Sequence, residues 1–574
     1  MKKTLAMLLA LVMVLSCLAA CEKGPAEETK GNDAPKETTE YVAPTQNTQP
    51  KEELGKLPLT EEDVTITIGL SQNVKTEDYE TNAYTLWLEE QTGINLEFKY
   101  FASSANEAVT QLNLMMAGNE ELPDILWGFS GVDSAMMFEL GEDEYIIDIK
   151  DYFSEYGYWF WEAYNEVPEA ERANIFRYGT DPNNGAFYGF PHYSESKSDN
   201  CATEASINAK WLEAIGEKAP TTVEELYNVL KKFATEDPNG NGKADEIALL
   251  GSDMHRSDIV SFIINAFVYC VDSNIFNATD GEIWVPYTTD EYRQAMIYLH
   301  KLYSEGLLSS LTYTIADSAE VKALMTPADG TAIVGLAGAT RSLHYEKDNP
   351  AALEYVALAP LKAATELGGY GAYMGNTFNY WTFITSDCED PVLAFKLLDF
   401  MSGQESFLRL RYGVFGEDWV YADEGAVSAS GTVAAIKALD SSVYGSQNNR
   451  TWHDTRSQIM PLHLWAGTWV DDGSWTATIT KNLTMDKIAN YAAADHPEEV
   501  VQKLIFTNAE NEIVAGLEQP IKDYVKEARA MFISGVLDPN DDAAWNTYLS
   551  NLESQGLSQY IEVAQTAYTR MTAE

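Results

Sequence analysis

The chain has 574 residues, 45% of them hydrophobic, and its 38 basic against 88 acidic residues give a formal net charge of −50. This charge excludes nucleic acid and anionic lipid surfaces as partners. About 515 residues follow the N-terminal segments described next, which is too many for one hydrophobic core and predicts at least two lobes.

The N-terminus has the pattern of an export signal, expected over residues 1–20. Lys2 and Lys3 precede an almost unbroken apolar stretch at 4–16, which is too short for a stable membrane span. The Cys21 that follows Leu-Ala-Ala resembles the lipobox cysteine of bacterial lipoproteins. That resemblance implies cleavage before Cys21, its acylation, and attachment to the extracellular face of the cell membrane. The alternative is an ordinary secretory signal with an incidental cysteine.

Residues 21–58 are expected to form the lipidated cysteine and a disordered tether. They are rich in Pro, Thr, Glu, Lys and Asn and lack periodic apolar positions, so they bury too little surface to offset the entropy of ordering. A flexible chain of about 36 residues reaches roughly 30 to 35 Å. The folded part is therefore expected to stand clear of the membrane.

The folded part begins with alternating strands and helices. The patterns predict strands at 64–69, 95–100 and 123–127, with helices at 82–92 and 106–117 between them. This order predicts a parallel sheet covered by helices. Ligands bind beyond the carboxyl ends of such strands, where Trp127 is expected.

A second α/β unit is expected after residue 191. The patterns predict a strand at 246–251 and helices at 208–216, 222–235, 290–305, 391–401, 520–533 and 543–555. Two of these helices are expected to open on Pro391 and Pro520, because proline suits the first helical position.

Short motifs are spread from the start of the folded part to the last residues. They are NAYTLWL at 82–88 with TGI at 92–94, LPDI at 122–125, WL at 211–212 with PTT at 220–222, residues 292–308, RYG at 411–413, FISGVLD at 532–538, and Trp545, Tyr548, Ala567 and Tyr568. In this order and spacing they resemble the extracellular solute-binding proteins (family 1) of bacterial ABC importers, in the large class that handles oligosaccharides.

This resemblance implies a two-lobed, periplasmic-binding-protein-like α/β fold of type II, with discontinuous lobes joined by crossover hinge strands. The crossovers are expected near Pro191, Tyr355 and Ser402. They divide the chain into an N-terminal lobe of 59–192 plus 356–403 and a C-terminal lobe of 193–355 plus 404–574. The resemblance also implies a monomer that is not an enzyme, closes on an oligosaccharide and delivers it to ABC permease subunits, touching the membrane only through its lipid.

Alternating oxygen-bearing side chains between a predicted helix and strand suggest a structural Ca²⁺ loop. The proposed ligands are Asp237, Asn239, Asn241, the Lys243 carbonyl, Asp245 and Glu246. Calcium takes about six to eight oxygens, and Gly242 permits the tight turn. A true EF-hand has a glutamate at position 12, where this chain has Ala248, so Glu246 is expected to replace it. The alternative is a turn that holds no ion.

Aromatic residues outside periodic segments are candidates for a sugar site, because sugars present apolar C–H faces beside hydroxyls. The chosen ring-bearing residues are Trp127, Tyr193, Tyr380, Trp381 and Trp452, and the chosen hydrogen-bonding residues are Asn376, Asn379, Arg411 and Asp454. For any single tryptophan, packing in the core is the simpler interpretation.

Two other functions stay open from the sequence. A secreted glycoside hydrolase needs two carboxylates about 5 to 10 Å apart, and 88 acidic residues supply such pairs by chance. A peptide receptor on the same fold would favour backbone hydrogen bonding and a charged clamp over stacked rings.

Overall fold

The computed structural model describes residues 41–194, 204–252, 258–271, 276–315, 317–339, 344–363, 368–371, 377–440, 442–453, 459–460 and 469–573. The expected export signal, Cys21, Asn376 and Asp454 lie outside these residues. Residues 40–574 form one compact unit. Among the helices of the described ranges, none is both long and apolar enough to cross a membrane.

Within the segment expected to be a tether, the chain from Tyr41 onward contacts the folded part. The Tyr41 hydroxyl donates to the Ala173 carbonyl at 3.1 Å, and the Arg177 guanidinium lies 5.6 Å from the Tyr41 ring centroid. A short helix, α2 (Lys51–Leu54), follows. The Thr45 N–H and the Asn47 side-chain amide add hydrogen bonds to the Ser154 hydroxyl at 3.0 Å and the Glu155 carbonyl at 2.8 Å.

The first sheet has six strands in the order β14-β4-β11-β3-β1-β2. Their bounds are β1 Val64–Ser71, β2 Ile94–Phe101, β3 Ile125–Trp127, β4 Gly189–Ser194, β11 Thr377–Ile384 and β14 Ile459–Met460. β1 is parallel to both β2 and β3, whereas β11 is antiparallel to β3 and β4. The predicted β-α-β-α-β unit at the start of the folded part is therefore confirmed.

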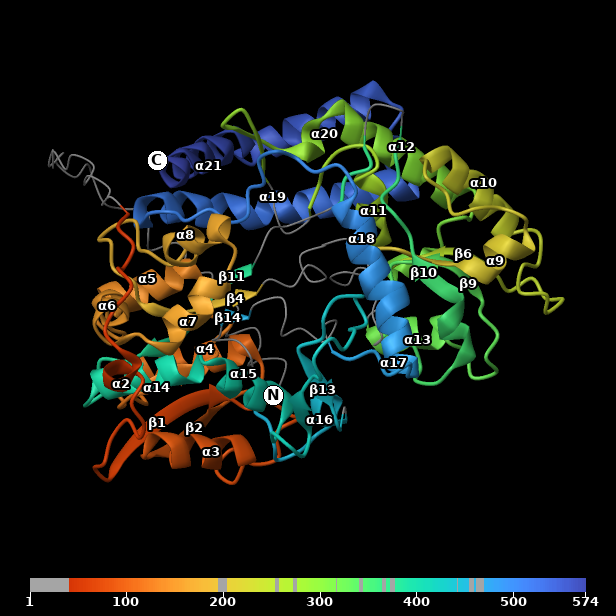
Figure 1. The fold of residues 1–574 in the computed structure, drawn as a ribbon. Coiled ribbons are helices and arrows are strands. Elements are labelled where there is room, and N and C mark those ends of the chain that lie inside the picture. Colours follow the sequence, from red (N-terminus) through yellow and green to blue (C-terminus); the bar gives the residue numbers. More distant parts are fainter. Residues whose placement is uncertain are drawn as a thin grey trace, which may run out of the picture. The chain divides into compact units, whose positions relative to one another are not determined.

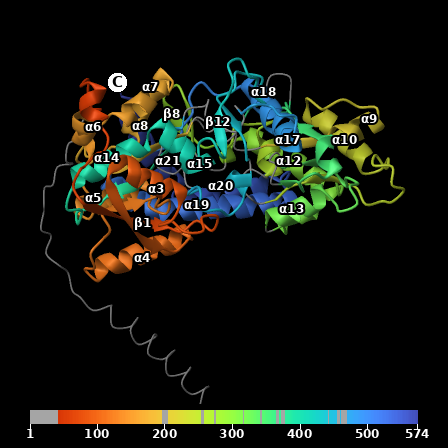
Figure 2. The ribbon, with the colours of Figure 1, turned by 60° about the horizontal axis from the view of Figure 1, so that its bottom comes forward.

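Two helices connect the first three strands, α3 (Ala83–Thr92) and α4 (Ala105–Ala117). The chain moves from β1 to β2 in one direction and from β2 back to β3 in the other. Right-handed crossovers must then place the two helices on opposite faces of the sheet. Figures 1 and 2 show α3 and α4 on opposite sides of β1.

Six more helices belong to this part of the chain. They are α5 Ser134–Glu142, α6 Lys150–Tyr156, α7 Trp159–Glu166, α8 Glu169–Arg177, α14 Pro391–Met401 and α15 Gln404–Tyr412. The buried carboxylate of Asp399 on α14 accepts hydrogen bonds from the backbone N–H groups of residues 158–160 at the start of α7. This contact joins two helices that are far apart in the sequence.

The second sheet has four strands in the order β10-β5-β9-β6. They are β5 Ser206–Asn208, β6 Ile247–Leu250, β9 Val334–Ala337 and β10 Tyr355–Ala357. The helical segments of this region are α9 Ala209–Ala214, α10 Val223–Phe233, α11 Ile259–Ile264, η1 Pro286–Thr288, α12 Asp290–Ser304, η2 Ser310–Tyr313, α13 Ser318–Met325 and η4 Pro350–Glu354. A hairpin of β7 (Asn277–Thr279) and β8 (Glu282–Trp284) lies between α11 and η1.

The C-terminal part is helical. It comprises α17 Trp475–Ile479, the π-helix η7 Thr480–Met485, α18 Asp486–Ala492, α19 Asn508–Ser534, α20 Asp542–Ser554 and α21 Leu557–Thr572. Figure 1 shows α21 beside α19, and the two helices are in contact. The helix predicted to open on Pro520 is wrong in its start, because α19 begins at Asn508 with a capping box of Thr507 and Glu510 and contains Pro520 in its interior.

The chain forms two large hydrophobic cores. The first core surrounds the first sheet, and the second core surrounds β5 and helices α10 to α12 together with α19 to α21. Leu410, Trp452 and Ile459 belong to the first core, whereas the predicted lobe boundary near Ser402 assigns them to the C-terminal lobe. Leu410 of α15 and Ile459 of β14 therefore pack with the first sheet, whereas Phe407, Leu408 and Met460 belong to a separate small cluster.

A smaller substructure follows α15. It contains β12 (Trp419–Tyr421) paired with β13 (Ile436–Ala438), and the short helix α16 (Ser442–Gly445). Its own small cluster includes Phe407, Trp419 and Ile436. Among the described residues, the second core has no equivalent of this small substructure.

Candidate functional site

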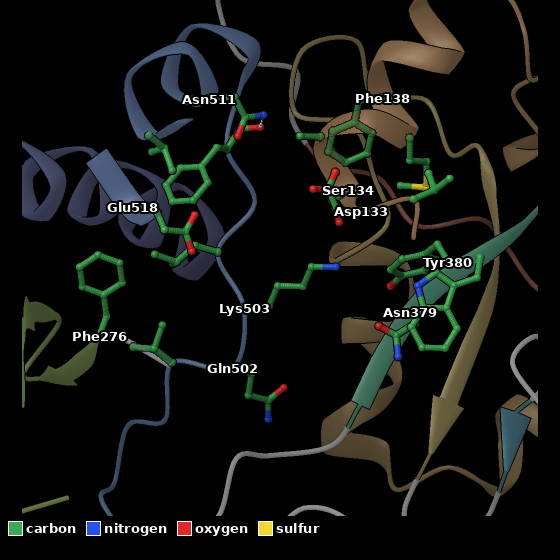
Figure 3. A pocket seen from close by; sticks show the side chains of 18 of the residues that line it. Asp133, Ser134, Phe138, Phe276, Asn379, Tyr380, Gln502, Lys503, Asn511 and Glu518 are labelled. Carbon is green, nitrogen blue, oxygen red and sulfur yellow. Dashed lines mark hydrogen bonds between the residues drawn. The ribbon is translucent and has the colours of Figure 1, made fainter. Parts of the chain in front are cut away.

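A cavity of about 480 Å³ is lined by residues of both cores. Residues 130–138 and 379–381 come from the first core region, and residues 501–506, parts of α19, Phe276 and Tyr560 complete the lining. Figure 3 shows these side chains around one space. Small-molecule sites usually have volumes of about 300 to 1,000 Å³, so the cavity has the size of a ligand site.

Three consecutive residues of β11, Asn379, Tyr380 and Trp381, line the cavity. Consecutive side chains of a regular strand point to opposite faces. Here the pairing with β4 shifts register between Tyr380 and Thr382, opposite Pro191. Proline has no N–H for the ladder and favours such bulges, which explains how neighbouring residues reach one cavity.

The half-buried indole of Trp381 stacks on the His192 imidazole, with ring centroids 5.8 Å apart and planes 17° from parallel. The Tyr380 hydroxyl donates to the Ile175 carbonyl at 2.6 Å. These contacts fix the orientation of both rings. Trp381 thereby contributes a held aromatic surface to the lining.

Lys503 crosses the cavity toward the strand residues. Its ammonium lies 5.7 Å from the Tyr380 ring centroid, within the range of a cation–π contact. Figure 3 shows this side chain pointing toward Tyr380 and Asn379, with Glu518 behind it. Burial lowers the pKa of Lys503 to about 8, although the nearby Asp133 carboxylate acts in the opposite direction.

The other charged groups of the lining have partners. One Asp133 carboxylate oxygen accepts the Met136 N–H at 2.9 Å at the start of α5. Glu518 and Lys522 form an ion pair at 2.5 Å on successive turns of α19. Both contacts hold these charges against the cavity wall.

Three amide side chains, those of Asn379, Gln502 and Asn511, also line the cavity. The Oε1 atom of Gln502 is buried and accepts no hydrogen bond within the described part of the chain. The Asn379 side chain likewise makes no hydrogen bond to another described residue. Because unpartnered buried polar atoms are costly, the amides of Gln502 and Asn379 suit a ligand with hydroxyl groups.

The residues expected to bind ligand fall into three groups. Asn379, Tyr380 and Trp381 meet at the cavity. Trp127, Tyr193 and Trp452 are at most 1% exposed and pack in the first core. Arg411 is buried on α15 outside the lining, with its guanidinium 5.6 Å from the Tyr412 ring.

The buried tryptophans form one aromatic cluster. The rings of Trp127 and Trp452 meet edge to face with centroids 5.8 Å apart, and the Trp452 indole N–H donates to the Thr85 hydroxyl at 2.9 Å. Such packing leaves neither ring a face for a ligand. The expectation that these rings serve as exposed platforms is not supported by their placement.

Sequence reasoning missed Lys503, Asp133, Gln502 and Glu518. The segment at 501–506 has neither helical nor strand periodicity and no motif. Asp133 carries only a helix-start signal, which it fulfils as the N-cap of α5. The site role of these residues follows from tertiary placement alone.

The loop at 237–246 has the turn geometry expected of a calcium loop. Side-chain oxygens of Asp237, Asn239 and Asn241 accept backbone N–H groups within the loop at 2.7 to 3.1 Å. Gly242, at the sixth position, has a φ of 74°, and glycine at this position allows the sharp turn.

The electrostatics of this loop fit a cation. The Oε1 atom of Glu246 is buried and has no hydrogen-bond partner among the described residues. Burial and the neighbouring carboxylates of Asp237 and Asp245 raise the pKa of Glu246. Among the described residues, no group of three Asp, Glu, His or Cys side chains is arranged to hold a metal ion.

Two α/β cores with a cavity lined from both define a two-lobed, periplasmic-binding-protein-like architecture. No protein-family model matches the chain. The fructooligosaccharide ABC transporter substrate-binding protein FusA of Streptococcus pneumoniae serotype 4 is 22% identical over 512 residues, covering 85% of this chain and 86% of FusA. Lipoprotein LipO of Bacillus subtilis is 31% identical over 121 residues, 20% of this chain and 22% of LipO.

Solved structures show the same fold. FusA in complex with kestose has a TM-score of 0.66 at 21% identity, covering 88% of this chain and 99% of that chain. An EF-hand mutant of FusA in complex with fructo-nystose has a TM-score of 0.67. An HMO-binding, ABC-transporter-associated solute-binding protein from Bifidobacterium longum infantis has a TM-score of 0.69 at 21% identity, covering 90% and 100%. The chain is thus similar in sequence to FusA over most of its length and has the periplasmic-binding-protein-like fold of these solved structures.

Proposed function

We propose that this protein captures an oligosaccharide outside the cell and delivers it to an ABC permease. The observation that supports this most strongly is the cavity of about 480 Å³, in which the held ring of Trp381 lies beside amide and charged side chains. A ring offers a surface for the C–H face of a sugar, and the polar groups match its hydroxyls. The ligands of the FusA structures, kestose and fructo-nystose, also favour a carbohydrate.

A glycoside hydrolase is less well supported. Such enzymes need two carboxylates placed to act as acid and as nucleophile or base. In the cavity lining, Asp133 caps a helix and Glu518 is paired with Lys522. These engagements favour binding without turnover, as in transporter binding proteins.

We expect the two cores to close on the ligand, because both contribute residues to the cavity lining. Because residues of both cores line the cavity, a ligand there gains contacts that depend on how the cores approach. Only a ligand with better contacts in the closed state shifts that equilibrium. Small-angle scattering should show a smaller radius of gyration with saturating ligand, and unchanged dimensions would contradict closure.

The location is proposed to be the extracellular face of the membrane, with a lipid on Cys21 and the protein acting as a monomer. The N-terminal sequence pattern and the match to the lipoprotein LipO support this. The variant Cys21→Ala should appear in the culture medium while the parent chain stays with the membrane. Equal release of both would refute the anchor.

We also propose that the loop at 237–246 binds a structural Ca²⁺. Asp237, Asn239, Asn241, the Lys243 carbonyl, Asp245 and Glu246 would hold the ion, which would neutralise the crowded carboxylates. Calcium at about 100 times its Kd adds about 2.7 kcal/mol of stability. Calorimetric Tm should therefore fall when EGTA replaces calcium, and the variant Asp237→Ala should not respond to either. If the Tm of the wild-type protein is the same with calcium and with EGTA, the proposed site is refuted.

The sugar site is tested by isothermal titration of wild type, Trp381→Ala and Trp87→Ala with an oligosaccharide panel. Burying about 60 Å² of ring face contributes about 1.5 kcal/mol, or a factor of about ten in Kd. Trp87 is a matched control, since its half-buried ring stacks on Phe400 with centroids 5.4 Å apart and does not line the cavity. Only Trp381→Ala should lose affinity. Absence of sugar binding by wild type, or equal losses in both variants, would contradict the proposal.

A further inference from the structure

The cavity holds one ammonium group that the protein itself does not neutralise. Lys522 is paired with Glu518 at 2.5 Å. Lys503 makes no ion pair or hydrogen bond within the part of the chain that the structure describes, and its ammonium lies 5.7 Å from the centroid of the Tyr380 ring. Asp133 is near enough to influence Lys503, but it is engaged as the cap of α5.

The position of Lys503 is fixed by its neighbours in sequence. Val501, two residues before it, is buried in the second core, and Ile505, two residues after it, is buried in the first core. The ammonium is therefore held in the cavity by anchors on both sides. Beside it, the Gln502 Oε1 atom is buried without a hydrogen-bond partner among the described residues.

Together these groups present a pattern for a particular ligand chemistry. An ammonium suits a carboxylate, and the neighbouring amide oxygen suits a hydroxyl donor. Figure 3 shows Asn379 on the opposite wall, toward which Lys503 points. A sugar acid carries both a carboxylate and hydroxyls on adjacent carbons.

Resting on the proposed function, we infer that the cavity selects an acidic oligosaccharide, and that Lys503 is the specificity-determining residue that binds a uronate carboxylate of the ligand. A neutral sugar would displace water from Lys503 without supplying a counter-charge, which is unfavourable for a partly buried ammonium. The lowered pKa of Lys503 agrees with a positive charge that burial already disfavours.

The net charge of −50 does not oppose this inference. Charges more than about 8 Å apart are largely screened at physiological ionic strength. A ligand carboxylate within the cavity therefore responds mainly to the lining. The net negative charge slows the approach of an anionic ligand, whereas the Lys503 ammonium attracts its carboxylate once the ligand is in the cavity.

The test is isothermal titration of the chain from residue 22 onward with trigalacturonate and with a neutral galactose trisaccharide of equal length. The variants are Lys503→Gln and Lys503→Arg, with Lys396→Gln as the control. Lys396 is also a half-buried lysine near a tyrosine, with its ammonium 5.3 Å from the Tyr156 ring, and it does not line the cavity. Thermal unfolding of each variant confirms that it folds.

Wild type is expected to bind the acidic sugar at least tenfold more tightly than the neutral one. Lys503→Gln should lose about 30-fold in affinity for the acid and less than threefold for the neutral sugar, whereas Lys503→Arg and Lys396→Gln should keep the preference. Binding of neutral sugars with no preference for the acid would overturn this inference and leave the proposed function intact. Binding of no sugar in the wider panel would instead refute the proposed function, and this inference with it.

Discussion

Raising the pH should weaken the binding of an acidic sugar by a predictable amount. Burial lowers the pKa of Lys503 to about 8 against the opposing effect of Asp133. A bound carboxylate stabilises the ammonium and raises that pKa, so the complex holds a proton that the free protein loses above pH 8. Affinity is therefore complete below pH 8 and falls as the pH rises through this value.

The size of the effect follows from the pKa of the free protein. With a value of about 8, roughly nine tenths of Lys503 is protonated at pH 7 and one tenth at pH 9. Affinity for the acidic sugar should then fall about tenfold between these two pH values, equivalent to about 1.3 kcal/mol. Affinity for a neutral sugar should change much less, because it supplies no charge to stabilise the ammonium.

Other groups that face Lys503 must be separated from it. Asp133, Glu518 and Lys522 line the same cavity. Burial raises the pKa of Tyr380 well above its ordinary value, which keeps the phenol neutral over this range. Lys503→Gln retains all of these neighbours and should bind the acid weakly with no dependence on pH between 7 and 9.

Isothermal titration at pH 6, 7, 8 and 9 in two buffers of different ionisation enthalpy measures both affinity and proton uptake. Proton uptake near pH 8 should approach half a proton per ligand and should vanish in Lys503→Gln. A flat affinity profile for wild type, or the same profile in both proteins, would refute the assignment of Lys503 as the carboxylate partner. Measuring at constant ionic strength removes screening as a variable.

Three further predictions concern positioning and stability. Arg570 does not contact the ligand, but Arg570→Ala should raise the Kd of the ligand threefold to tenfold in isothermal titration. The control Arg293→Ala breaks an ion pair to Asp542 at 2.8 Å and should leave the Kd unchanged. Burial raises the pKa of Asp399 to about 7 despite its backbone hydrogen bonds, so the stability of wild type relative to Asp399→Asn should fall by up to about 4 kcal/mol from pH 4 to 7 in denaturant titrations. The ion pair of Glu204 and Lys487 at 2.5 Å is almost fully buried; Lys487→Met should cost about 3 to 5 kcal/mol by the same assay, and adding Glu204→Gln should recover much of it.

The sequence could predict elements whose signals are local. The helices at Asp290–Ser304, Pro391–Met401 and Asp542–Ser554 match the predictions within a residue at each end, because apolar periodicity and caps lie within each segment. The error at α19 came from giving Pro520 priority over the Thr507 and Glu510 capping box. An interior proline removes a backbone hydrogen bond and crowds the preceding turn, at a cost of about 3 kcal/mol, and the packing of α19 on the second core offsets this cost.

The candidate site was only partly predictable. Asn379, Tyr380 and Trp381 were found because aromatic and amide residues cluster there, but their joint place in the cavity lining depends on the bulge opposite Pro191. Trp127 and Trp452 show the reverse case. They lie far apart in the sequence, and each looked like a loop aromatic until the fold brought the two rings together in the first core. Tertiary pairing, which no local pattern encodes, decided both outcomes.

The position of Lys503 links ligand selection to the C-terminal helix. Arg570 on α21 donates to both carboxylate oxygens of Glu510, at 2.7 and 2.8 Å, and to the Ile505 carbonyl at 2.8 Å. Burial alone would raise the pKa of Glu510, but the hydrogen bonds from Arg570 and from the Thr507 N–H lower it. The contact between Arg570 and Glu510 is therefore an ion pair. The last helix therefore holds the segment that carries the ammonium.

This arrangement places recognition on the segment that connects the two cores. Val501 and Ile505 are four residues apart and belong to different cores, and extended chain spans at most about 3.6 Å per residue. Lys503 can therefore move only a few ångströms relative to either core while both anchors hold. If the cores close on the ligand as proposed, a carboxylate bound to the Lys503 ammonium would contact one of the segments that joins them, and ligand choice and closure would then both involve residues 501–505.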